Sequence, residues 1–187
     1  MRFVVMSFAA CLLAGAAAQA GTDLNLPKFS AIEAHGGSHI ILHHGATQRV
    51  TVIKGDMKVS SVTVVGDKLL VEECPTWCLH HPELEIEVTT PNPVEALAAH
   101  GGGDIDARGP FPRQPKLSVT AHGGGNINAS AIPADTVWAE AHGGGEIRVN
   151  ALTEINAEAH GGGDIHYTGN PPKVHSSVHG GGDVSRD

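Results

Sequence analysis

The residues of this sequence with the greatest capacity for chemistry are histidines that recur in one short motif. Thirteen histidines occur in 187 residues. Six of them begin a His-Gly-Gly segment, usually extended by a third glycine and then by a polar residue and Ile or Val. An imidazole can bind a divalent metal ion, exchange a proton near neutral pH, or donate and accept hydrogen bonds. The six motif histidines are His35, His100, His122, His142, His160 and His179.

The residues before each motif alternate between apolar and polar side chains, which is typical of β-strands with one buried face. Positions one, three and five before His122 are Ala121, Val119 and Leu117, and the same positions before the next two motifs are also aliphatic. From the second motif onward the steps are 22, 20, 18 and 19 residues. A unit of this length cannot bury its apolar face alone. We therefore expect stacked strand–corner–strand repeats that form an all-β solenoid.

In such a stack, equivalent residues of successive turns lie about 4.8 Å apart, so the motif histidines are expected to form one or two outward-facing ladders. In one interpretation, neutral imidazoles stack and hydrogen-bond along the corner as a structural element. In the other, neighbouring imidazoles and a carboxylate or water bind Zn²⁺, Cu²⁺ or Ni²⁺. No other cofactor is expected. The candidate metal ligands are His100, His122, His142, His160 and His179.

The first 20 residues have the pattern of a signal peptide. Arg2 precedes an apolar run that ends in Ala18-Gln19-Ala20, a typical cleavage site. This pattern predicts export to the periplasm, the outer membrane or the exterior of the cell. No later stretch is long and apolar enough to cross a bilayer, so we expect no transmembrane segment in the mature chain.

Two cysteines, Cys74 and Cys78, remain after the predicted signal peptide. An oxidising compartment favours a disulfide between them. One alternative is a metal site that adds His80 and His81 to the two thiolates. A thioredoxin-like redox motif has less support, because three residues rather than two separate the thiols.

The N-terminal part of the mature sequence differs from the repeats. Residues 21–90 contain one motif and several strand-like runs, and Gly55-Asp56 and Gly66-Asp67 are expected turns. Pro91-Asn92-Pro93 marks the expected joint to a repeat region over residues 91–187. The last motif has no obvious cap, so we expect self-association through this C-terminal end.

Composition and motifs argue against several classes of function. The formal net charge is −8 at pH 7, which gives nucleic-acid binding no electrostatic basis. His-Gly-Gly-Gly also occurs in the oxyanion holes of some esterases, but the sequence has no Gly-x-Ser-x-Gly nucleophile motif. The P-loop and His-Glu-x-x-His patterns do not occur either. We therefore expect a protein that is not an enzyme.

The segment from Phe29 to Gly37 and the later Gly-Gly-Asp-Ile and Gly-Gly-Asn-Ile corners resemble the auto-transporter adhesin head GIN-domain family of exported bacterial proteins. The resemblance covers roughly residues 27 to 187. It implies a right-handed parallel β-helix at the cell envelope and leaves the biochemical function open. The family often has a small residue such as Ser where this chain keeps histidine.

Together these observations predict an exported, non-enzymatic binding module of the cell envelope or surface, with an adhesin-like role. Its expected ligand is a glycan or a protein. The alternative is a periplasmic protein that binds divalent metal ions through the stacked histidines.

Overall fold

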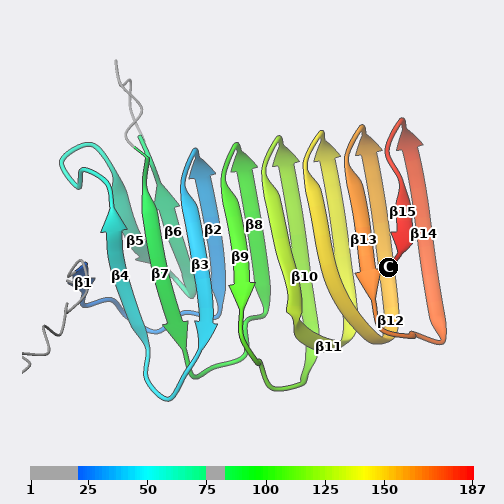
Figure 1. Ribbon diagram of the computed structural model, residues 1–187, viewed down its shortest axis with the longest axis horizontal. Helices are drawn as coiled ribbons and strands as arrows, with labels where there is room; N and C mark the ends of the chain where they lie inside the picture. Colours follow the sequence, from blue (N-terminus) through cyan, green and yellow to red (C-terminus); the bar gives the residue numbers. More distant parts are fainter. Residues whose placement is uncertain (1–20, 75–82) are drawn as a thin grey trace, which may run out of the picture.

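The computed structural model describes residues 21–74 and 83–187, and these residues form an all-β protein (Figure 1). Fifteen strands belong to one sheet. In chain order they are β1 (Thr22–Leu24), β2 (Ala31–Gly36), β3 (His39–His44), β4 (Arg49–Lys54), β5 (Ser61–Val65), β6 (Lys68–Glu72), β7 (Glu85–Thr90), β8 (Ala96–Gly101), β9 (Asp104–Arg108), β10 (Gln114–Gly123), β11 (Asn126–Gly143), β12 (Glu146–Gly161), β13 (Asp164–Thr168), β14 (Lys173–Gly180) and β15 (Val184–Arg186).

The sheet is curled and open, so the expected right-handed parallel β-helix is wrong. Hydrogen-bonded neighbours run β1-β4-β7-β3-β9-β11-β10-β8-β2-β6-β5, which means that the sheet runs out along one layer and returns along the other (Figure 1). Strand directions are mixed, since β1 with β4, β4 with β7 and β5 with β6 are antiparallel. The N-terminal strands that follow the first motif thus reverse direction by short turns, one of which is the expected Gly66-Asp67 turn between β5 and β6.

The long strand β11 joins the two layers. Its first residues, Asn126 to Asn128, pair with β9 in one layer, and its end pairs with β10 in the other. Against β12 its register shifts between Ala129 and Pro133. Such an irregularity bends a strand and increases its local twist, and β11 and β12 bend between the layers at the lower edge of Figure 1.

Parallel pairing sets the motif histidines side by side. β2, β8, β10, β11, β12 and β14 are consecutive neighbours at their C-terminal ends, where His35 pairs with His100 and His100 with His122. The same register continues through the remaining three motif histidines. Each histidine is followed by a glycine with positive φ, and from Gly123 onward the backbones of neighbouring corners also approach closely. At Gly143, for example, φ is 111° and a Cβ atom would lie 2.6 Å from the carbonyl oxygen of Gly123.

The apolar faces of the two layers meet in one core. Its members are aliphatic residues of alternating strand positions, and Leu117, Val119 and Ala121 are at most 1% exposed. After each of the first five corners an isoleucine enters the same core, as Ile127 and Ile147 do, and after the last corner Val184 packs against it. The polar positions between them face outward, where the motif histidines lie.

The division into residues 21–90 and 91–187 stays a prediction, and one continuous sheet contains strands from both sides of that boundary. The predicted signal peptide, residues 1–20, lies outside the described residues. Within 21–74 and 83–187, no helix has the length and apolar character needed to cross a membrane.

Candidate functional site

The six motif histidines form one continuous stack, which we call the histidine column. Successive ring centroids lie 4.6, 5.0, 4.7, 4.8 and 5.1 Å apart from His35 to His179, and the ring planes are within 19° of parallel. The rings project from the outward face at the ends of their strands. His100 is 34% exposed and His142 is 38% exposed, so each imidazole presents one edge to solvent.

A second row flanks the column, because residues two positions apart on a strand share a face. The flanking row consists of Glu33, Ala98, Thr120, Glu140, Glu158 and Ser177. Some of its members contact the histidine of their own strand. Glu140 Oε2 lies 3.8 Å from His142 Nε2, and the Ser177 hydroxyl lies 3.0 Å from Nε2 of His179.

The most compact group of the site is at the first histidine. Oε1 of Glu33 lies 2.6 Å from Nε2 of His35 and 3.4 Å from Nε2 of His100. The other oxygen of the carboxylate, Oε2, pairs with the Lys68 ammonium. Glu33 is only 13% exposed, whereas Glu140 and Glu158 are 51% and 59% exposed.

This environment changes the proton affinity of two groups. Burial raises the pKa of Glu33, but hydrogen bonds from Lys68 and His35 outweigh it, so the pKa lies below its usual value. Burial, and then the neighbouring charge of His35, lower the pKa of His100. At neutral pH the cluster therefore holds an ionised carboxylate and, at His100, a neutral imidazole.

The acidic and amide residues that follow the glycines form a separate row with a structural role. Asp104 Oδ1 accepts hydrogen bonds from the backbone N–H and the side-chain amide of Asn126, at 3.0 and 2.9 Å. Asn126 Oδ1 in turn accepts from the backbone N–H of Glu146, and Asp164 from that of Asp183. These side chains link neighbouring strands.

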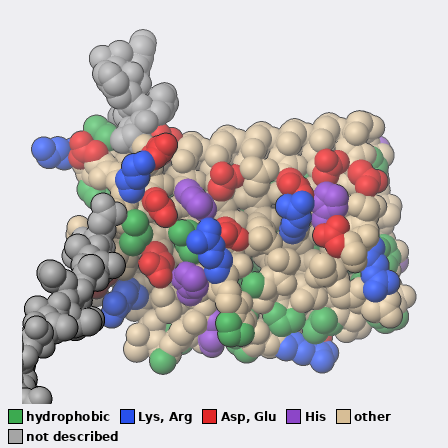
Figure 2. All heavy atoms as spheres, in the orientation of Figure 1, with side chains coloured by type: hydrophobic (Ala, Val, Ile, Leu, Met, Phe, Trp, Pro, Cys, Tyr) green, Lys and Arg blue, Asp and Glu red, His purple; other side chains and the backbone are tan. Residues whose placement is uncertain are grey.

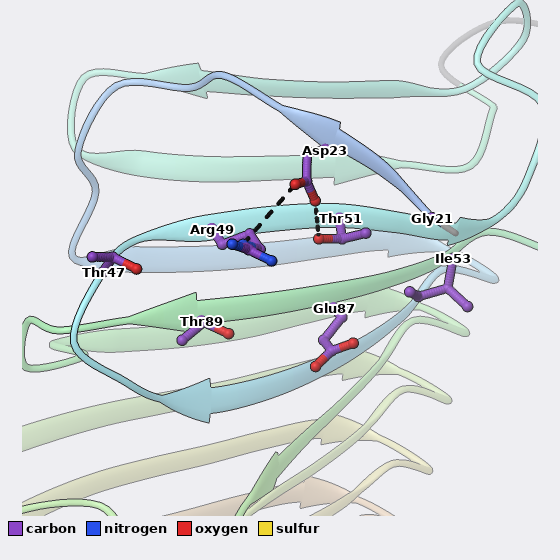
Figure 3. Close-up of a pocket in the computed structure, with 8 residues that line it drawn as sticks. All are labelled: Gly21, Asp23, Thr47, Arg49, Thr51, Ile53, Glu87 and Thr89. Atoms are coloured by element: carbon purple, nitrogen blue, oxygen red, sulfur yellow. Dashed lines mark hydrogen bonds and ion pairs between the residues drawn. The ribbon is translucent and has the colours of Figure 1, made fainter. Parts of the chain in front are cut away.

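A pocket lies at the end of the sheet formed by the N-terminal strands, beside β1, β4 and β7 (Figure 3). Asp23 points toward Arg49 and Thr51; its carboxylate lies 4.0 Å from Nε of Arg49 and accepts a hydrogen bond from the Thr51 hydroxyl. Glu87 and Thr89 line the opposite side. These polar groups lie on an open strand surface, and the Asp23 carboxylate is already paired with its neighbours.

Figure 2 shows the outer face of the layer that contains β3, β4, β7 and β9. Acidic, basic and histidine side chains are interspersed on this face, so it has no patch of one charge sign.

The structure brings together all five predicted metal ligands, His100, His122, His142, His160 and His179, in one row with His35. Metal binding by these residues stays a prediction. Sequence reasoning missed Glu33, although its place two residues before His35 in a strand was a usable signal. Cys74 is disulfide-bonded. Its predicted partner Cys78, like His80 and His81, lies outside the described residues, so this pairing also stays a prediction.

A family model described as "Putative auto-transporter adhesin, head GIN domain" matches residues 28–114 and 113–171. The chain belongs to this family. The resemblance inferred from the repeated corners is thereby confirmed, and membership in the GIN-domain family implies an exported or surface protein. No curated protein matches this GIN-domain chain in sequence.

Crystal structures with similar folds include a "putative adhesin" from Bacteroides fragilis, with a TM-score of 0.54 and 20% identity over 89% of this chain and 95% of that chain. Two proteins from Parabacteroides distasonis, a "putative adhesin" and a "Putative lipid binding protein", have TM-scores of 0.49 and 0.40 and identities of 14% and 15%. Each alignment covers 89% of this chain, and 96% and 95% of the other chain. At this identity the likeness to the Bacteroides protein concerns the fold alone.

Proposed function

We propose that this GIN-domain protein is an exported, non-enzymatic binding module that holds an extended polar polymer, a glycan of the cell envelope, along its histidine column. The observation that carries the proposal is the column itself. It repeats the same half-exposed imidazole at intervals of 4.6 to 5.1 Å. A row of identical donors and acceptors suits a ligand that also repeats, because each unit of the polymer meets the same groups.

The arrangement of the polar groups supports a binding rather than a catalytic role. Enzyme sites usually combine a concave pocket with a few convergent polar groups. In the described part of the chain, the histidines and carboxylates instead form open rows on strand surfaces. The pocket of Figure 3 contains Asp23 already engaged by Thr51 and Arg49.

Three observations support an exported location. They are the membership in an adhesin family, the disulfide at Cys74 and the signal-peptide pattern of residues 1–20. Disulfides persist mainly in oxidising compartments. The periplasm, the outer membrane and the cell exterior all satisfy this condition.

A glycan array tests the proposed ligand. The purified protein is compared with the triple variant His122→Ala/His142→Ala/His160→Ala and with a matched control, His43→Ala/His44→Ala/His175→Ala, which removes three histidines outside the column. Loss of three hydrogen-bonding groups at about 1 kcal/mol each lowers the affinity by on the order of a hundredfold, and the control leaves it unchanged.

Two results would contradict glycan binding by the column. One is the absence of any bound glycan on an array that includes envelope polysaccharides. The other is equal binding by the two triple variants, with circular dichroism showing that both are folded.

A second candidate function is binding of Zn²⁺, Cu²⁺ or Ni²⁺ along the column, and the alignment of the rings is the observation that favours it. Two ligands of one tetrahedral zinc ion lie about 3.3 Å apart, given bonds of about 2.0 Å. Stacked neighbours such as His122 and His142, with centroids 4.7 Å apart, would have to tilt toward each other. Calorimetric titration with the three ions tests this candidate, which requires heat of binding that is lost in the column triple variant.

A further inference from the structure

We infer that Glu33, His35 and His100 form a discrete binding site for one divalent first-row metal ion, with Zn²⁺ as the ion that best suits the donor set. The site lies at one end of the column and does not depend on glycan binding. Its zinc binding should survive in the triple variant of His122, His142 and His160, whereas binding along the whole column should not. One ligand atom from each of the three residues lies within 4.8 Å of the other two. Among the described residues, only this group of histidines, cysteines and carboxylates is so compact.

The two distances from Glu33 are close to those of a tetrahedral zinc site, and the stacked rings of His35 and His100, with centroids 4.6 Å apart, need to tilt toward each other to complete it. Oε1 of Glu33 lies 3.4 Å from Nε2 of His100, and about 3.3 Å is expected between two zinc ligands with bonds of about 2.0 Å. The 2.6 Å contact between Glu33 Oε1 and His35 Nε2 is a hydrogen bond. A metal ion replaces the shared proton of this contact and widens the pair by less than 1 Å. Two imidazoles and one carboxylate leave the fourth position open for water or a ligand group.

Local structure explains why the three groups converge here. His35 and His100 are paired residues on the parallel strands β2 and β8, and Glu33 lies two positions before His35 on the same face. The residue paired with Glu33 is Ala98. Because Ala98 carries only a methyl group, no larger side chain of the flanking row stands between Glu33 and His100.

Lys68 acts as a positioning residue for the carboxylate. It comes from β6, the neighbour of β2 on the other side, and its ammonium pairs with Oε2 of Glu33. This leaves Oε1 directed at the two imidazoles. Partners of this kind orient ligating groups in metal sites generally.

The rest of the column lacks this convergence. Glu158 Oε2 lies 3.7 Å from His160 Nε2 and is far more exposed than Glu33. Thr120 and Ser177 replace the glutamate in their repeats. The Glu158–His160 pair therefore provides a matched control, with the same residue types and spacing but without the third ligand in reach.

Zinc titration of the full, oxidised protein tests the site, with isothermal calorimetry and a competing chromophoric chelator as readouts. We expect one zinc ion per chain. Changes to groups behind the ligands alone cost about 10- to 100-fold in metal affinity, so Glu33→Gln and His100→Asn should each lower it by about a hundredfold or more. Glu158→Gln and His160→Asn should leave it unchanged.

A second measurement keeps the test decisive if Glu33→Gln is poorly folded. In NMR spectra of the native protein with labelled histidine, substoichiometric zinc should shift the ring signals of His35 and His100 and leave those of His160 and His179 in place. The inference is overturned if the native protein binds no zinc, if Glu33→Gln binds as tightly as the native protein, or if His160→Asn loses as much affinity as His100→Asn. None of these outcomes bears on the metal-free glycan array.

Discussion

Alanine substitutions at two adjacent corner glycines, Gly143 and Gly144, should differ in their effect on stability, because the backbones of neighbouring strands approach closely only at Gly143. Gly143 has a φ of 111° and follows His142 of the column. A Cβ atom there would lie 2.6 Å from the Gly123 carbonyl oxygen, whereas at Gly144 it would have nothing within 4 Å. Left-handed backbone costs about 1–2 kcal/mol for a residue with a Cβ, and overpacking adds about 1–3 kcal/mol.

The free energy of unfolding of Gly143→Ala should therefore fall by about 2–5 kcal/mol. In a protein of this size each kcal/mol shifts the melting temperature by about 2–4 °C, so the loss is roughly 4 to 20 °C. Gly144→Ala, one residue away, should change the free energy of unfolding by no more than about 0.5 kcal/mol. Thermal and urea unfolding followed by circular dichroism measure both variants. Equal melting temperatures for the two variants would refute the account of the corner as a close contact between backbones.

Further predictions concern the column, the core, the disulfide and the open strands. The pKa of His100 is lowered in the folded protein, so as the pH falls this histidine takes up a proton in the unfolded chain before it does so in the folded one. The melting temperature measured with EDTA should therefore fall as the pH drops below about 6.5. An unchanged melting temperature between mildly alkaline and mildly acidic buffer would argue against this. Ile147→Ala should cost about 2–5 kcal/mol in urea unfolding because Ile147 is fully buried, and Val174→Ala, at a 45% exposed position, should cost far less. Peptide mapping of the unreduced protein should recover Cys74 linked to Cys78, and any other partner would reject the pairing. The edge strands β14 and β15 each pair on one side within the described residues, and sedimentation velocity over a wide concentration range should detect their self-association, which a constant monomer would exclude.

The sequence by itself determined which side chains face inward and which repeats can lie side by side. Leu117, Val119 and Ala121 alternate with polar residues, and all three are buried in the core. The regular spacing of the motifs anticipated the pairing of His122 with His142 and of His142 with His160. These features were predictable because period-two alternation and repeated glycines act through local geometry.

Only the tertiary structure decided the direction of the N-terminal strands and the composition of the compact cluster. Alternation is the same in parallel and antiparallel strands, so the sequence could not distinguish a coil of parallel turns from a curled sheet in which β4 runs antiparallel to β7. Glu33 reaches His100 because Ala98 leaves space and Lys68, 35 residues further along the chain, holds the other carboxylate oxygen. Such a cluster depends on contacts between distant strands, and no local pattern of residues specifies those distances.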